Sequence, residues 1–142
     1  MSINTVPASR VTPEKIERLG EKEIFVFGSS LMGVHFGDAA RVAYDKFGAG
    51  GVSEGLKGST YAIPVVRAGI DMVKPHIEAF LSFARSHTEY RFFVTRIGCG
   101  IAGFTDEDIA PLFAVAVGME HVTLPASFWE VLQRKGLYVP HI

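Results

Sequence analysis

The sequence has only one cysteine, Cys99, and no excess of charge of either sign. A single cysteine excludes a disulfide within the chain and a cysteine-rich zinc site. The 14 basic and 15 acidic residues give a formal net charge of −1. Proteins that bind a phosphate backbone carry a basic footprint, so this balance argues against nucleic acid as the main partner.

Long apolar runs are also missing. Residues 109–118, IAPLFAVAVG, are far short of the about 20 residues that a membrane span needs. The opening stretch, MSINTVPASR, lacks the apolar centre of a signal peptide. We therefore expect a soluble, cytoplasmic protein with no membrane partner. With 48% hydrophobic residues, the chain is expected to form one globular domain, residues 1–142.

Strand and helix patterns alternate along the chain. Runs rich in β-branched and aromatic residues predict strands at 23–27, 60–66, 90–97 and 121–125. Apolar residues at helical spacing predict a helix that begins near Pro75 and others over 12–20, 38–47, 105–117 and 127–135. This alternation predicts the fold class α/β, as a three-layer α/β/α sandwich around a mixed, mostly parallel sheet.

Local signals predict how three of these helices begin. Thr12, followed by a proline, is expected to cap the first helix. Thr105 and Asp108 have the spacing of a capping box, in which a side chain at each position bonds the backbone of the other. Ser127 and Glu130 have the same spacing and predict a second capping box.

Two features predict breaks in regular structure. Proline cannot donate a hydrogen bond to a neighbouring strand, so the strand that contains Pro64 is expected at a sheet edge or a bulge. Residues 49–59, AGGVSEGLKGS, are polar and rich in glycine, and they predict a long loop.

Two more glycine-rich stretches, 28–37 and 98–103, directly follow predicted strands. In parallel sheets, ligands bind at the carboxyl ends of the strands. Glycine lets backbone N–H groups converge on an anion, and the dipole of a following helix favours negative charge. Either stretch alone is better explained as a tight turn, but the two together predict a phosphate-binding site.

The stretch 96–108, RIGCGIAGFTDED, allows two other interpretations. A nucleophilic Cys99 needs a nearby base, such as His35 or His121, whereas a lone cysteine is more often a small apolar filler. Residues 98–103 match a dinucleotide fingerprint, but the next predicted strand ends without the acid that would hold a ribose. We therefore favour a cradle of backbone N–H groups.

The remaining polar residues have simpler explanations. Acids at 106–108 are favoured in the first turn of a helix by its dipole alone. Arg96 is placed to pair either with a phosphate or with these acids. The histidines have no ligand spacing, so no metal and no cofactor is expected. His35 stays a candidate because it lies in a glycine-rich loop at a strand end.

Two stretches resemble a known family. Residues 25–49 and 92–113 resemble the two ligand loops of macrodomain-like proteins, which bind ADP-ribose. The second is most similar to the branch of terminal ADP-ribose glycohydrolases, whose loop contains Ile-Gly-Cys-Gly-Leu-Asp-Gly. The chain also resembles short uncharacterised bacterial and phage proteins, and the resemblance covers most of residues 24–125.

The resemblance implies an α/β/α sandwich that binds a small nucleotide ligand. Backbone amides of residues 98–104 would wrap the diphosphate, and Phe104 would flank the distal ribose or the adenine. Residues 28–39 would close the other side, with His35 and Asp38 near the ribose. The ligand-binding residues so implied are Gly28, Ser29, Ser30, Gly33, Gly37, Asp38, Gly98, Cys99, Gly100, Ile101, Ala102, Gly103 and Phe104.

Two departures from that branch bear on its chemistry. Where the hydrolases carry an acid in this loop, the chain has Ala102, which cannot transfer a proton. Where they carry a lysine on an earlier loop, it offers Arg67, and arginine stays protonated. We therefore predict binding of ADP-ribose or a related nucleotide diphosphate without the lysine–acid hydrolase chemistry.

Two alternatives stay open. The first is a hydrolase that acts on a phosphate or glycosidic bond of such a ligand, with His35, Asp38 or Cys99 as the catalytic candidates. The second is a structural or partner-binding α/β protein with no nucleotide ligand, in which the glycines only turn the chain.

Overall fold

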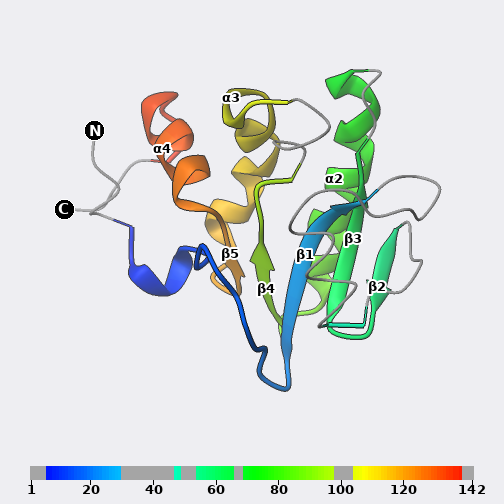
Figure 1. Cartoon of the computed structure of the whole chain (residues 1–142). Coiled ribbons are helices and arrows are strands. Elements are labelled where there is room, and N and C mark those ends of the chain that lie inside the picture. The colour runs from blue at the N-terminus through cyan, green and yellow to red at the C-terminus, as the bar shows by residue number, and fades with distance from the viewer. Residues whose placement is uncertain (1–5, 30–46, 49–53, 66–68, 98–103, 139–142) are drawn as a thin grey trace.

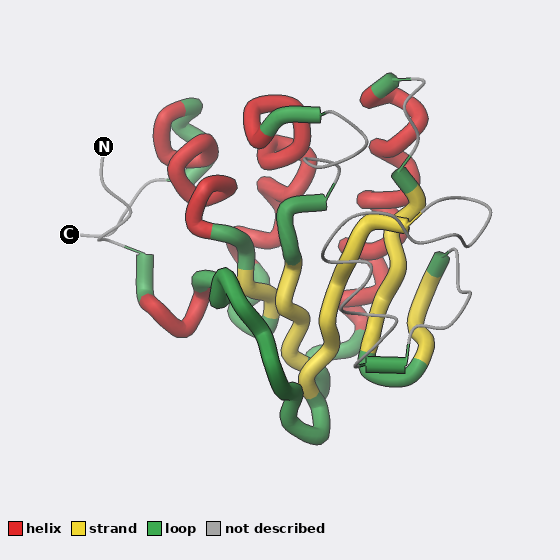
Figure 2. Tube along the Cα trace, viewed as in Figure 1, coloured by secondary structure: helices red, strands yellow, loops and turns green. Residues whose placement is uncertain are grey.

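The computed structural model of the chain describes residues 6–29, 47–48, 54–65, 69–97 and 104–138. Over these residues, five strands form one sheet that is accompanied by three α-helices and two 3₁₀ helices (Figures 1 and 2). The strands are β1 (Glu23–Ser29), β2 (Gly55–Lys57), β3 (Thr60–Pro64), β4 (Arg91–Val94) and β5 (Val122–Thr123). The helices are η2 (Ala8–Arg10), α2 (Ile70–Ser86), α3 (Asp106–Ile109), η3 (Ala110–Gly118) and α4 (Ala126–Arg134). The predicted α/β class is confirmed.

The sheet is mixed and mostly parallel, with the strand order β2-β3-β1-β4-β5. β1 pairs in parallel with β3 on one side and with β4 on the other, and β4 pairs in parallel with β5. Of the described strands, β2 alone runs antiparallel to its neighbour, β3. The four predicted strands are all present, although β3, β4 and β5 are shorter than predicted.

Both faces of the sheet carry buried apolar side chains. Along β1, successive side chains point to opposite faces and so belong to two different clusters. Ile24 and Val26 belong to the main core, which they share with residues of α2, α3, η3 and α4. Phe25 and Phe27 face the other way and form a second cluster with Phe47, whose ring centroid lies 5.1 Å from that of Phe25. A sheet with buried apolar residues on both faces is compatible with the predicted three layers.

Phe80 of α2 lies at the centre of the main core and is fully buried. Its ring meets those of Tyr61, Phe92 and Phe113 at centroid distances of 5.0, 5.5 and 6.3 Å, with the rings steeply inclined to one another. Inclined rings place the positive edge of one aromatic against the negative face of the next. One side chain thereby joins α2 to β3, β4 and η3.

The helix predicted to begin near Pro75 begins earlier, at Ile70. Pro75 lies inside α2, where it cannot donate the hydrogen bond that a helix expects from that position. The extra turn buries Val73 completely. Burial of a valine side chain stabilises by about 1.5–3 kcal/mol, which exceeds the net value of one backbone hydrogen bond.

The helix predicted over residues 12–20 is absent from the structure, and this prediction is wrong. Thr12 does not cap a helix: its hydroxyl lies 2.7 Å from that of Thr123 on β5, and its N–H donates to Leu124. Val11 forms a parallel bridge with the same leucine. Residues 10–12 therefore pair with the β5 edge, and Ile16 and Leu19 further along pack against the cluster of Phe25 and Phe27.

Two expectations about breaks need correction. Residues 55–57, within the predicted long loop, form β2, whose three residues pair with β3. Pro64 lies in an interior strand and not at an edge. Val65 donates to Ser29 of β1, so the Pro64 nitrogen faces the β2 side, beyond the last pair of the β2 ladder at Gly55. No ladder hydrogen bond of the described strands is lost there.

The capping box of Thr105 and Asp108 is confirmed, but α3 continues after one turn as the 3₁₀ helix η3. The predicted apolar face is confirmed as well, since Ile109 and Phe113 are fully buried. The second capping box is wrong. α4 begins after Pro125 without a side-chain cap, and the Ser127 hydroxyl donates instead to Asp106 at 3.0 Å.

Arg10 connects the N-terminal segment to the end of η3. Its guanidinium donates to four backbone carbonyls, those of Ala116, Val117, Met119 and Val122, at 2.9–3.4 Å. It also lies over Trp129, 5.3 Å from the ring centroid. Burial lowers the pKa of Arg10 from its usual value, with Glu120 acting in the opposite direction. The arginine thus adds a charged donor to carbonyls at the end of η3 and on β5, of which those of Ala116 and Met119 also accept a backbone N–H.

We expect Arg10→Ala to lower the free energy of unfolding by at least about 2 kcal/mol, because it removes a charged donor from several backbone carbonyls. Arg10→Lys keeps the charge but not the planar fork, and is expected to restore only part of the loss. Denaturant unfolding followed by circular dichroism measures both. Arg18→Ala, at an exposed arginine, is the control. Equal losses for Arg10→Ala and Arg18→Ala would contradict this role.

Gly58 turns the chain between β2 and β3 with φ of +58°, and a Cβ there would lie 2.9 Å from the carbonyl oxygen of Phe47. Gly136 has a similar φ of +74°, but a Cβ at that position meets nothing within 4 Å. Both alanine variants adopt a left-handed conformation, which costs about 1–2 kcal/mol. We expect Gly58→Ala to lower the unfolding midpoint in denaturant clearly more than Gly136→Ala. Equal midpoints would show that the close approach to Phe47 is not a constraint.

Candidate functional site

The strand order places side by side the two strands, β1 and β4, after which the predicted glycine-rich loops begin. β1 and β4 are parallel neighbours, so their carboxyl ends lie at the same edge of the sheet. After β1 the chain continues to β2 and β3 on one side of it, and after β4 it continues through α3 and η3 to β5 on the other side (Figure 1). Neighbouring strands that lead in opposite directions define a topological switch point, where α/β sheets bind ligands outside the carboxyl ends of the strands.

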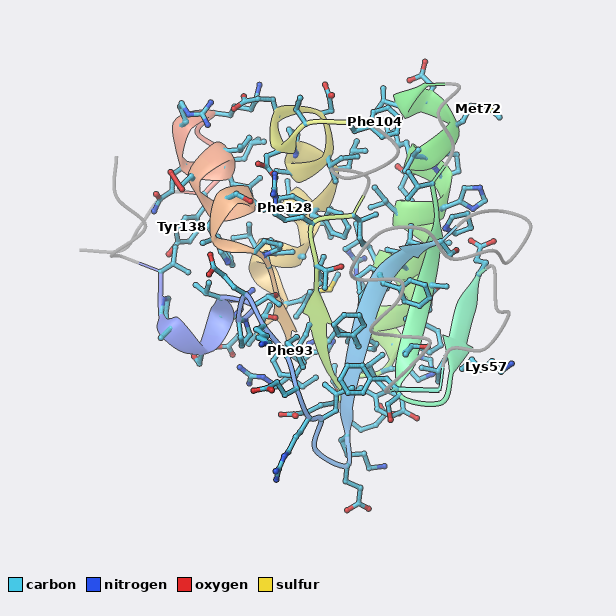
Figure 3. The ribbon with its side chains drawn as sticks, in the orientation of Figure 1. Lys57, Met72, Phe93, Phe104, Phe128 and Tyr138 are labelled. Carbon is cyan, nitrogen blue, oxygen red and sulfur yellow. The ribbon has the colours of Figure 1, made fainter. Side chains whose placement is uncertain are left out.

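Three of the predicted ligand-binding residues are described. Gly28 and Ser29 are the last two residues of β1 and therefore lie at this edge. Phe104 is half-buried and packs against the main core just before α3 (Figure 3). The others lie outside the described residues: Ser30, Gly33, Gly37, Asp38, Gly98, Cys99, Gly100, Ile101, Ala102 and Gly103. The same holds for His35 and Arg67, and for the helix predicted over 38–47 except its last residue.

The end of β4 is firmly attached to β1. The Thr95 hydroxyl donates to the carbonyl oxygen of Val26 at 2.7 Å, and the Thr95 N–H donates to the same oxygen at 3.2 Å. Ile97 is almost completely buried, and its N–H donates to Thr95. The chain therefore leaves the sheet toward residues 98–103 from a fixed position.

The start of α3 is equally well defined. The Thr105 N–H donates to an Asp108 carboxylate oxygen at 3.0 Å, and the Asp108 N–H donates to the Thr105 hydroxyl at 3.2 Å. The helix thus satisfies these amides with its own side chains, and carboxylates already compensate its positive end. The sequence predicted that this helix would attract a phosphate. The structure therefore gives this helix start less capacity to bind an anion than the sequence predicted.

The carboxylates at 106–108 have structural partners. Arg96 forms a two-pronged ion pair with Asp106, at 3.0 Å for each nitrogen–oxygen contact, which is one of the two roles predicted for this arginine. Glu107 lies 2.5 Å from Arg134 of α4. Within the described residues, no three histidine, cysteine or acidic side chains gather in a way that could hold a metal ion. Asp106 and Glu107 therefore attach α3 to the segment after β4 and to α4.

One polar pair was missed by the sequence analysis. The Nδ1 atom of His76 lies 2.9 Å from a carboxylate oxygen of Glu54. Glu54 directly precedes β2 and His76 lies near the start of α2, so both are near the carboxyl end of β3. The side chains are 27% and 40% exposed, and an ion pair of this exposure contributes little to stability. No sequence signal marks the pair, because 22 positions separate its members.

Comparison of the chain with family models, with curated proteins and with solved structures finds no match. The fold and the site together define a class: an α/β domain with a mixed sheet and a switch point between β1 and β4. Across the parts of the chain described above, no helix combines the length and the apolar character needed to cross a membrane.

The electrostatics near β3 predict a pH effect. Burial, and to a smaller extent the Glu54 carboxylate, raises the pKa of Tyr61 above its usual value. The unfolded chain ionises this tyrosine first, so its contribution to stability is complete below about pH 10 and declines as the pH rises further. We expect the melting temperature of the wild type to fall more steeply above pH 10 than that of Tyr61→Phe. Parallel curves from pH 8 to 11.5 would contradict the shift.

Proposed function

We propose that this domain binds ADP-ribose or a related nucleotide diphosphate outside the carboxyl ends of β1 and β4. The observation that carries the proposal is the position of the two glycine-rich stretches. One follows β1 and the other follows β4, and these strands are the neighbours that form the switch point. Glycine-rich segments at a switch point are a recurrent way of binding phosphate groups in α/β sheets. The resemblance of both stretches to macrodomain ligand loops supplies the identity of the ligand.

The charges at this edge favour recognition by backbone groups. The carboxylate of Asp106 pairs with Arg96, the cation that lies two residues before the second glycine-rich stretch. The start of α3 carries three acids of its own. A diphosphate would therefore be held by loop amides, while Phe104 offers an aromatic surface to a ribose or base. Binding of this kind needs no chemically active side chain.

Binding without turnover is the function that these residues support best. Ala102 and Arg67 stand where the hydrolase branch has its acid and its lysine. The described Glu54–His76 pair lies beside β3, on the far side of β1 from β4, and not at the switch point. We place the protein in the cytoplasm as part of the same proposal.

Isothermal titration with ADP-ribose, with AMP and NAD as comparators, tests this function. We expect ADP-ribose to bind with a Kd on the order of micromolar, and Gly100→Val to abolish the heat signal, because a branched side chain would obstruct the amides. Gly118→Val is a matched control: it makes the same substitution at an exposed glycine where a Cβ meets nothing within 4 Å. It should bind as the wild type does.

Circular dichroism must first show that both variants are folded. Phe104→Ala is a second variant, expected to weaken binding without abolishing it, because it removes ring contacts and leaves the amides in place. The absence of heat from the folded wild type with all three ligands would refute the ADP-ribose assignment. Equal affinity of wild type and folded Gly100→Val would refute the backbone cradle.

A further inference from the structure

We propose that Arg96 and Asp106 are positioning residues, whose ion pair fixes the distance between the two ends of the stretch 98–103. This inference rests on the proposed function, because that stretch is the expected diphosphate loop. Arg96 lies two residues before it and Asp106 lies three residues after it. A contact between the two side chains therefore closes a short loop of the chain.

The geometry of the pair suits this role. The guanidinium uses two nitrogens, Nε and Nη2, to contact both oxygens of one carboxylate at 3.0 Å. Such a two-pronged contact restricts the relative orientation of the partners as well as their distance, which a lysine could not do. The pair therefore constrains the backbone on both sides of residues 98–103.

Arg96 and Asp106 are each held in place by further hydrogen bonds nearby. On one side, the hydroxyl and N–H of Thr95 attach the chain beside Arg96 to β1. On the other, the Ser127 hydroxyl of α4 donates to Asp106 at 3.0 Å, and the capping box orders the backbone from Thr105 onward. The ion pair thus joins two parts of the structure that are already held in place. Ordering a loop before a ligand arrives reduces the entropy lost on binding.

A contribution to the stability of the whole fold explains the Arg96–Asp106 pair less well than a positioning role does. The Arg96 side chain is 57% exposed, and exposed ion pairs contribute little to the stability of a fold. The competing explanation is direct contact, in which Arg96 leaves Asp106 and binds a ligand phosphate. The two explanations predict opposite effects of removing the Asp106 charge. Direct contact predicts tighter binding, because the arginine is released and a repulsive carboxylate is lost, whereas positioning predicts weaker binding.

The test is titration of ADP-ribose into the wild type and the variants Arg96→Gln, Asp106→Asn, Ser127→Ala and Glu107→Gln. Glu107→Gln is the matched control, since it removes the same charge from the same turn but from a carboxylate that pairs with α4. Positioning predicts about tenfold weaker binding for Arg96→Gln and for Asp106→Asn, and no further loss in the double variant. Glu107→Gln should bind as the wild type does.

Ser127→Ala changes no charge and gives the cleanest comparison. It should weaken binding, because Asp106 loses one support, whereas direct contact predicts no effect. Wild-type or tighter binding by both Asp106→Asn and Ser127→Ala would overturn the inference.

Hydrogen exchange of the ligand-free protein separates this inference from the proposed function. Peptides that cover residues 98–103 should exchange faster in Arg96→Gln and Asp106→Asn than in the wild type and in Glu107→Gln. If the wild type binds no ADP-ribose, the proposed function fails. Faster exchange in the two variants would still show that the Arg96–Asp106 pair restrains residues 98–103. Unchanged exchange in both would overturn it, whatever the ligand.

Discussion

The parallel pairing of β1 with β3 on one side and with β4 on the other is the constraint on which the rest of the arrangement depends. Parallel neighbours cannot be joined by tight turns, so a connection must cross a face of the sheet. Here α2 carries the chain from β3 past β1 to β4, and its Phe80 packs on both strands that flank β1. That crossing places β4 beside β1 and so creates the switch point.

Two arginines join segments around this sheet in comparable ways. Arg10 binds backbone carbonyls at the end of η3, and Arg96 binds the carboxylate of Asp106 at the start of α3. In both cases a planar guanidinium joins segments that the sheet alone does not hold together. The first contact lies at the β5 side of the domain and serves the fold. The second lies beside the proposed ligand edge, where we propose that it positions the loop.

Local signals predicted what depends on local interactions. The strand at 23–27 and the capping box of Thr105 were identified because apolar runs and three-residue spacings carry their own information. The helix predicted from Thr12 is absent, because the Thr12 hydroxyl bonds to Thr123, 111 positions away. The capping box predicted at Ser127 is absent, because its hydroxyl donates to Asp106 instead. The two strands at the site were predicted, although β1 ends two residues later and β4 three residues earlier than expected. The pairing of Arg96 with Asp106 could be identified only from the folded geometry.

The position of Arg10 has a consequence for the order in which the chain can fold. During synthesis this residue emerges 112 positions before Val122, one of the carbonyls that it binds. Arg10 therefore lacks this partner until the residues up to Val122 have been synthesised. Contacts this distant in sequence slow folding, and they leave apolar strand edges exposed in the meantime. Arg10 is thus held in place only after the residues of β5 have been made.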